Sequence, residues 1–283
     1  MFKTNRSLSE FSTFGIGGPI HYFAEVKSIE EMREGLLFAK NQSLPFLILG
    51  KGSNCLFDDR GYNGVVLLNR IDFCEWKDQS VQVGAGYSFS YLGVQSAKLG
   101  LSGLEFASGI PASVGGAIFM NAGANGKETC EALVSVQFMD TFGNLKEYTK
   151  DDLFFSYRHS SFQTQLGAII SATFRFTPVA TSRQKQLEII DHRMKTQPLK
   201  DKSIGCIFRN PEGNSAGHLI QESGLKGLRC GGAKVSEIHA NFIVNDQQAT
   251  SKDILSLMHE VQQRVFLKTG IHLQPEVRVI PYD

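Results

Sequence analysis

Hydrophobic and polar positions along this chain follow the period of strands in some segments and the period of helices in others. Short apolar runs, several with a polar residue at every second position, predict strands. They are residues 21–26, 46–50, 65–68, 81–85, 133–140, 144–149, 168–178 and 272–280. Phe142 and Gly143 separate two of these runs with turn residues, so we expect a β-hairpin there.

Helical features occur in residues 28–41, 88–99, 179–197 and 251–269. Ser28 and Glu31 have the spacing of a capping box at the start of the first helix, and Gly100 closes the second. The last helix is the clearest, because its apolar residues recur on one face. Strands and helices therefore alternate along the chain.

The amino-acid composition of the chain changes near residue 178. The helix at 179–197 is polar, and residues 198–217 are rich in Lys, Gly, Asn and Pro. A second unit of strands and helices follows them. We therefore predict a domain boundary near residue 178.

Composition limits the functions that this chain can have. Of its 283 residues, 42% are hydrophobic and 20% are charged, the balance of an ordinary globular protein. The net charge of +1 gives no long-range field for nucleic acid or an anionic membrane, so an anionic ligand needs a local cluster. The polar N-terminus lacks the apolar core of a signal peptide, and no apolar run is long enough to span a membrane.

The cysteines indicate a reducing compartment. Five are present, an odd number, and no two have the C-x-x-C spacing of a zinc or redox site. Neither a disulfide framework nor a metal site is indicated. We expect a soluble, cytoplasmic protein with reduced thiols.

Two glycine-rich segments are candidates for binding a phosphate-containing ligand. GKGSN (50–54) follows a buried strand, and SGIPASVGGAIFMNAGANG (108–126) has no clear period. Glycine lets backbone N–H groups turn towards a ligand, and successive N–H groups form a nest for a pyrophosphate. Neither segment has Rossmann spacing, and GKG lacks the Ser or Thr of a P-loop. The hypothesis is a dinucleotide between the two loops; tight turns are the alternative.

A third stretch, GCIFRNP (205–211), places Cys206 shortly before an arginine and an asparagine. No cysteine or histidine lies near it in the sequence to share a metal ion. The residues alone leave open a nucleophile, a proton donor or a small buried side chain. The last of these is the commonest use of cysteine.

Several motifs, in order along the chain, carry a resemblance to known proteins. GKGSN and SGIPASVGGAIFMNAGA resemble the FAD-binding domain of the vanillyl-alcohol-oxidase-like (PCMH) flavoproteins. Further motifs resemble the UDP-N-acetylenolpyruvoylglucosamine reductase family over nearly the whole chain. They are STFGIGGPIHYF (12–23), SYRHS (156–160), GCIFRNP, AGHLIQESGLKG (216–227), VSEIHANFIVN (235–245) and QPEVRVI (274–280).

The resemblance implies an α+β fold, a domain organisation and a reaction. FAD would bind a domain of two lobes, residues 1–60 and 61–178, and the substrate a C-terminal α/β domain, residues 179–283. The last strand, within 272–283, would return towards the flavin. NADPH would be the reductant and a UDP-sugar the substrate, in peptidoglycan precursor synthesis. The length resembles that of the compact form of the family, and we expect a monomer.

The resemblance also assigns the flavin site. The residues expected to hold FAD are Lys51, Gly52, Ser53, Asn54, Ile110, Ala112, Ser113, Gly115, Gly116, Asn121, Ala122, Gly123 and Arg278. Ala112 departs from the family pattern, which commonly reads GIPGS where this chain has GIPAS. An alanine there would be strained only if the position requires a positive φ.

Three catalytic roles follow from the implied reaction, the reduction of an enol ether next to a carboxylate. Arg158 matches the cation that stabilises the growing negative charge, and Glu276 matches the carboxyl that polarises the substrate carboxylate. Cys206 falls where the family usually has the serine that donates a proton to carbon. This is a second departure, because a thiol has an ordinary pKa of about 8.5 and ionises at alkaline pH.

The residues expected to bind the substrate are Arg193, Arg209, Asn210, His239 and Asn241. Arginine and asparagine supply hydrogen-bond donors for a diphosphate or a carboxylate. For His239, a structural role through hydrogen bonds is the alternative.

Other functions stay open at the level of sequence. Another flavin oxidoreductase of the same fold, acting on a sugar or hydroxy acid, often attaches FAD through a histidine or cysteine, and residues 108–126 contain neither. A non-enzymatic nucleotide-binding module would keep the glycine loops without needing Arg158, Cys206 and Glu276 together. A metal-dependent hydrolase is least favoured, since no cluster has ligand spacing.

Overall fold

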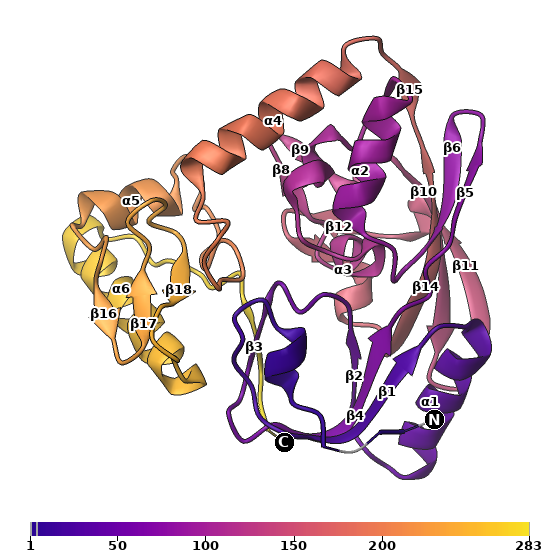
Figure 1. Cartoon of the computed structure of the whole chain (residues 1–283), viewed down its shortest axis with the longest axis horizontal. Coiled ribbons are helices and arrows are strands. Elements are labelled where there is room, and N and C mark those ends of the chain that lie inside the picture. The colour runs from indigo at the N-terminus through magenta and orange to yellow at the C-terminus, as the bar shows by residue number, and fades with distance from the viewer. Residues whose placement is uncertain (1, 4, 283) are drawn as a thin grey trace. The chain divides into compact units, whose positions relative to one another are not determined.

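The computed structural model describes residues 2–3 and 5–282, which group into two compact units. The first unit contains residues 2–3, 22–51 and 64–193, and the second contains residues 5–21, 52–63 and 194–282. Each unit has both helices and strands (Figure 1), as predicted for an α+β protein. The division into three domains at residues 60 and 178 stays a prediction. Among the residues that the structure describes, no helix is long and apolar enough to cross a membrane.

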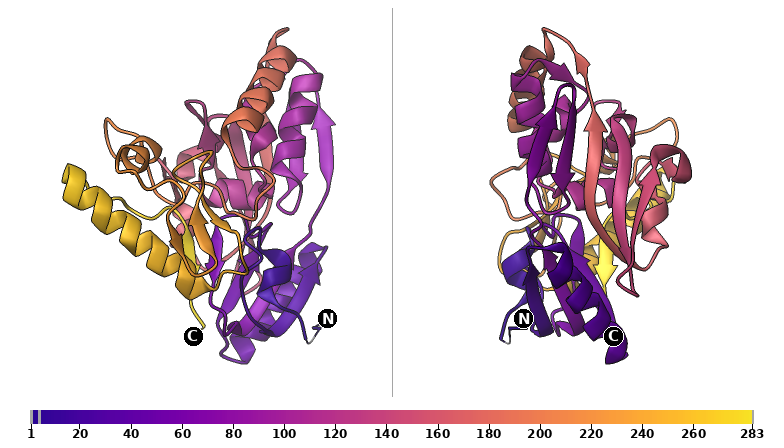
Figure 2. Two further views of the ribbon diagram at one scale, coloured as in Figure 1. Left: turned by 60° about the vertical axis from the view of Figure 1, so that its left-hand side comes forward. Right: turned by 90° about the vertical axis from the view of Figure 1, so that its right-hand side faces the viewer.

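A five-stranded antiparallel sheet forms much of the first unit. Its strands, in spatial order, are β11 (Leu145–Thr149), β10 (Leu133–Asp140), β14 (Gly167–Arg175), β6 (Ser80–Gly84) and β5 (Cys74–Lys77). Figure 2 shows them from the side in its right-hand view. The predicted hairpin is confirmed, because β10 pairs with β11 and Gly143 has a φ of +80° in the turn.

Helices α2 (Phe89–Lys98) and α3 (Val114–Phe119) belong to the core of this sheet. Phe89 and Val114 are fully buried in it. The sequence predicted α2 but not α3, because VGGAIF is too short and glycine-rich to show a helical period. Strand β5 was also missed, since its four residues CEWK are too few for a clear alternation.

A smaller sheet in the order β1-β4-β2 packs with the helix α1 (Ile29–Asn41). Its strands are β1 (Ile20–Val26), β4 (Tyr62–Asn69) and β2 (Phe46–Leu49). The Ser28 hydroxyl caps α1 as predicted, accepting the N–H of Glu31 at 3.1 Å. The Glu31 carboxylate accepts the N–H of Lys27.

Short elements complete the first unit. They are β7 (Leu101–Ser102) with β15 (Thr177–Pro178), β8 (Gly123–Ala124) with β9 (Lys127–Glu128), β12 (Phe155–Ser156) with β13 (His159–Ser160), and the 3-10 turns η2 (Glu105–Gly109), η3 (Thr129–Glu131), η4 (Lys150–Asp152) and η5 (Ser161–Gln163). The predicted polar helix is α4 (Ser182–Thr196). It starts where the Ser182 hydroxyl donates to the Leu101 carbonyl oxygen at 2.9 Å.

The second unit has a separate core around α6 (Ser251–Thr269), beside short strands in Figure 1. These elements are α5 (Ala216–Glu222), β16 (Arg229–Cys230), β17 (Ala233–Val235) and β18 (Ile243–Asn245). Helix α6 has the predicted bounds. Thr250 and Asp253 form a capping box at its start, and Gly270, with a φ of +73°, ends it.

Only the end of the predicted strand 272–280 is a strand. This is β19 (Arg278–Ile280), which pairs in parallel with β3 (Cys55–Phe57). Pro275 has no N–H group and therefore interrupts a ladder. The residues around it form only an isolated bridge with Phe208. The prediction was wrong for this part because it followed the alternation and neglected the proline.

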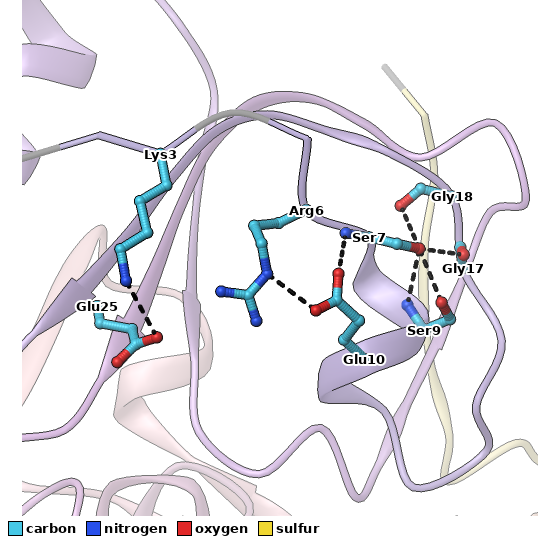
Figure 3. Close-up of polar contacts among 8 residues, drawn as sticks. All are labelled: Lys3, Arg6, Ser7, Ser9, Glu10, Gly17, Gly18 and Glu25. Carbon is cyan, nitrogen blue, oxygen red and sulfur yellow. Dashed lines mark hydrogen bonds and ion pairs between the residues drawn. The ribbon is translucent and has the colours of Figure 1, made fainter.

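The N-terminal turn η1 (Leu8–Phe11) in the second unit is held by hydrogen bonds drawn in Figure 3. The Ser7 hydroxyl donates to the carbonyl oxygen of Gly17 at 2.9 Å. The turn ends at Phe11, whose carbonyl oxygen would lie 2.0 Å from a Cβ on Gly52. Gly52 also has a φ of +59°. Both constraints require glycine at this position of the GKGSN loop.

A pair of substitutions in α6 tests how the second unit is stabilised. Leu257 is fully buried and Leu267 is 83% exposed. We expect Leu257→Ala to lower the free energy of unfolding by about 2–5 kcal/mol, because it leaves a cavity. The control Leu267→Ala should stay within about 0.5 kcal/mol of the wild type. Urea denaturation followed by circular dichroism measures both, and equal effects would contradict the placement of α6.

Candidate active site

The two glycine loops meet in the first unit at Gly50 and Ser113. A Cβ on Gly50 would lie 2.3 Å from the Oγ atom of Ser113. The same hydroxyl caps α3 by accepting the N–H of Gly116 at 3.3 Å. The two segments that the sequence assigned to one ligand are thus in contact within the first unit. This contact involves only the start of GKGSN, because residues 52–54 belong to the second unit.

Ser88 joins both loops. Its hydroxyl accepts a hydrogen bond from Nζ of Lys51 at 2.9 Å, and Ser88 forms an isolated bridge with Ser113. Burial lowers the pKa of Lys51, Arg70 lowers it further, and Asp72 opposes the change. Sequence reasoning named Lys51 but missed Ser88, although a serine at the start of a predicted helix is an N-cap signal.

Unpaired peptide N–H groups make residues 51–54 a fit for a pyrophosphate. Among the described residues, no protein acceptor pairs with the N–H groups of this range. These donors are therefore available to a ligand, and successive N–H groups in a glycine-containing loop can form an anion nest. In the other loop, the donors already paired within the protein include those of Ile110, Ala112, Val114, Gly115 and Gly116. That loop would therefore contribute to a pyrophosphate site mainly through its shape, and less through N–H donors.

The departure at Ala112 does not strain the backbone. Among the described non-glycine residues, positive φ values occur at Asn121 and Arg158 of the candidate site, but not at Ala112. Ala112 is also nearly buried, at 8% exposure. Alanine therefore replaces glycine here without a conformational cost.

Asn121 holds the turn that follows α3. Its side chain is fully buried, and its Nδ2 atom donates to Oε2 of Glu128 at 2.8 Å and to the Ser156 carbonyl oxygen at 3.0 Å. Its Oδ1 atom accepts the N–H of Cys130 at 3.1 Å. The carboxamide therefore fixes the path of residues 121–123, which were predicted to lie near the flavin.

Arg158 contacts this same turn. It lies between β12 and β13 with a φ of +57°. Its Nη2 atom donates to the carbonyl oxygen of Gly123 at 3.0 Å, and its Cζ atom is 4.8 Å from the ring centroid of Tyr157. Within the first unit, the structure thus brings the predicted catalytic cation to the predicted flavin segment, Asn121, Ala122 and Gly123.

Cys206 lies on the central one of three neighbouring segments in the second unit. The N–H of Ile207 donates to the Asn241 carbonyl oxygen at 2.8 Å, and its own carbonyl oxygen accepts the N–H of Glu276 at 2.8 Å. Cys206 also forms an isolated bridge with Phe242. The predicted proton donor and the predicted polarising carboxyl therefore belong to adjacent backbone segments.

Asn54 connects the GKGSN loop to the segment of Glu276. Its Nδ2 atom donates to the Glu276 carbonyl oxygen at 3.2 Å, and its own carbonyl oxygen accepts the N–H of Arg278 at 3.1 Å. Burial raises the pKa of the neighbouring Cys55 thiol to about 11, and the charge of Arg278 opposes this rise only in part. Cys55 is therefore a neutral thiol at physiological pH.

Asn241 and His239 both serve the fold. Asn241 is 3% exposed, and its carboxamide pairs with both backbone groups of Phe208, at 3.0 and 2.8 Å. Nδ1 of His239 accepts the N–H of Asn241 at 3.3 Å. These bonds fit the structural alternative for His239, and contact with the substrate stays a prediction for both residues.

The other residues predicted to bind the substrate have different surroundings. Oδ1 of Asn210 accepts the N–H of Ala216 at the start of α5, at 3.0 Å. Arg209 is half-buried, and its buried Nε atom has no acceptor within the described part of the chain. Arg193 packs on Gly109 in the first unit, where a Cβ would lie 2.4 Å from its Cδ atom.

The predicted catalytic residues thus fall into two sets. Arg158 is in the first unit, and Cys206 and Glu276 are in the second. Within the residues that the structure describes, no group of three or more His, Cys, Asp or Glu side chains could hold a metal ion. The chemistry that these residues can supply is a fixed cation, a carboxyl group and a thiol proton donor.

Comparisons with known proteins identify the family of this chain. A family model described as UDP-N-acetylenolpyruvoylglucosamine reductase, C-terminal domain, matches residues 197–280, and one described as FAD binding domain matches residues 20–149. The curated reductase of that name from Protochlamydia amoebophila is 56% identical over 283 residues, covering 100% of this chain and 95% of that protein. The one from Chlamydia felis is 48% identical and covers 97% and 93%.

A solved structure extends the agreement to the fold. The crystal structure of the reductase from Thermus caldophilus has a TM-score of 0.85 and 36% sequence identity, and covers 99% of this chain and 100% of that one. The predicted combination of a flavin-binding domain and a C-terminal domain of this reductase type is confirmed. This chain belongs to the UDP-N-acetylenolpyruvoylglucosamine reductase family.

Proposed function

We propose that this chain is an FAD-dependent reductase that uses NADPH to convert UDP-N-acetylglucosamine enolpyruvate into UDP-N-acetylmuramate, in peptidoglycan precursor synthesis. The observation that carries the proposal is membership of the reductase family over the whole chain. That membership does not favour another flavin oxidoreductase acting on a sugar or hydroxy acid. The enzyme works as a monomer in the cytoplasm, where UDP-sugars and NADPH occur, and its net charge of +1 favours no nucleic-acid partner.

The residues present fit FAD. The unpaired N–H groups of residues 51–54 suit its pyrophosphate, and Ser113 faces the start of the same loop. The turn at residues 121–123 and the side chain of Arg278 complete the proposed contacts. FAD, when bound, carries hydride from NADPH to the terminal vinyl carbon of the substrate.

Three side chains stabilise negative charge on the substrate and supply protons to it. Arg158 stabilises the negative charge that builds on the substrate carboxylate, since a guanidinium stays charged at any working pH. Glu276 shares a proton with that carboxylate and so polarises it. Cys206 donates the proton on its Sγ atom to the carbon next to the carboxylate. The backbone bond between Ile207 and Glu276 supports the pairing of the last two roles.

Arg193, Arg209, Asn210, His239 and Asn241 bind the UDP-sugar in this proposal. Arg209 has the most direct support, because a buried Nε atom without an acceptor in the described chain suits a diphosphate or carboxylate. Asn241 also holds residues 206–208 in place, since its carboxamide is bonded to Phe208.

An anaerobic experiment tests the proposed reaction. NADPH should bleach the visible flavin absorbance of the purified protein, and UDP-N-acetylglucosamine enolpyruvate should then restore it. Restoration by the sugar nucleotide supports the assignment. If NADPH bleaches the band and the sugar nucleotide does not restore it, the chain is still a flavoprotein but the assigned substrate is wrong.

The pH dependence of the second half-reaction tests Cys206. A thiol donates its proton only below its pKa, which is ordinarily about 8.5, so the wild-type rate should fall as pH rises through that range. In Cys206→Ser the hydroxyl does not titrate there, so we expect this alkaline limb to disappear. Stopped-flow reoxidation between neutral and strongly alkaline pH measures it.

A cysteine away from the site provides the control for this experiment. Cys230→Ser, in β16, should keep the alkaline limb of the wild type. An unchanged limb in Cys206→Ser would show that another group titrates, and the role of Cys206 as the acid would be abandoned.

The contact between the glycine loops can be tested by a double substitution. Gly50→Ala places a Cβ 2.3 Å from Oγ of Ser113, so either this hydroxyl must leave its position as the cap of α3 or the loops must separate. Overpacking of this kind costs about 1–3 kcal/mol, so we expect FAD to bind about tenfold more weakly. Ser113→Ala removes the clashing oxygen, leaving its Cβ at 3.3 Å, and should restore part of the affinity in the double variant. Flavin fluorescence titration measures all four proteins. No recovery in the double variant would contradict the contact.

A further inference from the structure

The turn that carries Arg158 has an unfavourable residue for its conformation. Tyr157 and Arg158 connect β12 to β13, and of the two only Arg158 has a positive φ, +57°. A negative φ followed by a positive one is the pattern of a type II turn, whose second central residue is normally Gly or Asn. An arginine in this conformation is strained and persists only when its surroundings hold it there.

Gln163, in η5, supplies the bonds that hold the turn. Its Nε2 atom donates to the carbonyl oxygen of Arg158 at 3.1 Å and to that of Phe119 at 3.0 Å. A carboxamide nitrogen has two protons, one for each of these two oxygens, and the sulfur of Met120 is a weaker third acceptor at 3.8 Å. Because the carbonyl of Arg158 is fixed, its ψ is fixed too, and with it the direction in which the side chain leaves the backbone.

The second acceptor of Gln163, the Phe119 carbonyl oxygen, lies at the end of a helix. Phe119 is the last residue of α3, and carbonyl groups at the end of a helix have no partner within it. The Ser160 hydroxyl also donates to the Phe119 carbonyl oxygen, at 2.7 Å. Gln163 thus ties the carbonyl of Arg158 to the helix end from which residues 121–123 continue, and the guanidinium reaches back to Gly123.

We propose that Gln163 is a positioning residue for Arg158: its carboxamide, bonded to the carbonyl oxygens of Arg158 and Phe119, aims the guanidinium at the substrate carboxylate. The inference rests on the proposed function, in which Arg158 is the cation of the second half-reaction. Gln163 itself needs no contact with substrate or flavin. A purely structural role would instead lower stability and leave both half-reactions of the folded protein unchanged.

Two variants of similar size test this role. Gln163→Met keeps the length of the side chain and removes both donors. Gln163→Glu keeps the shape but turns oxygen atoms towards two carbonyl oxygens. In each we expect reduction by NADPH at the wild-type rate, and reoxidation by the enolpyruvyl sugar nucleotide about 10- to 100-fold slower, the effect of a misplaced catalytic group.

Gln165→Met is the matched control. Gln165 is two residues away, half-buried, and its Oε1 atom has no partner among the described residues. We expect both of its half-reactions to match the wild type. Thermal unfolding of all variants shows which are folded, and with two variants at position 163 a single misfolded protein does not decide the result.

The background variant Arg158→Ala separates the two proposals. If Gln163 acts through Arg158, adding Gln163→Met to Arg158→Ala should slow reoxidation no further. A further tenfold loss, or reoxidation within twofold of the wild type in both Gln163 variants, overturns the positioning role. Wild-type reoxidation in Arg158→Ala itself would overturn the proposed function of Arg158, which is a different failure.

Discussion

Buried peptide groups outside regular helices and strands must find hydrogen-bond partners, and this requirement shapes both parts of the candidate site. The functional segments are irregular, so carboxamide side chains supply partners that a ladder would otherwise provide. Asn121 serves Ser156 and Cys130, and Asn241 serves both backbone groups of Phe208. A carboxamide can do this because it presents a donor and an acceptor, as a peptide group does.

The features of the fold that could be predicted from the sequence are those with a clear period and clear boundary residues. Helix α6 and the β10–β11 hairpin have strong periodicity and clear boundary residues, and both were predicted correctly. Helix α3 was not, because its glycines hide the period that packing imposes on it. The strand predicted at 272–280 was too long, since a single proline outweighs the alternation around it.

The sequence predicted which residues carry the chemistry of the candidate site, but not the hydrogen bonds that hold them in place. Motifs named Arg158, Cys206 and Glu276, and the structure gives the last two adjacent backbone segments. Sequence could not show that Asn241 turns its carboxamide inward, because side-chain direction depends on partners far away along the chain. The strained φ of Arg158 was likewise invisible, since an arginine is an unusual choice for that conformation.

The parallel pairing of β19 with β3 has a consequence for how the protein folds during its synthesis. Asn54 and Glu276 are separated by 222 positions, yet the loop that contains Asn54 is held by the segment of Glu276 and Arg278. While the chain emerges from the ribosome, that loop lacks these contacts until residues 276–278 have been made. Contacts between such distant segments form slowly. The loop that contains Asn54 therefore reaches its final conformation only after a segment more than two hundred residues further along has been made.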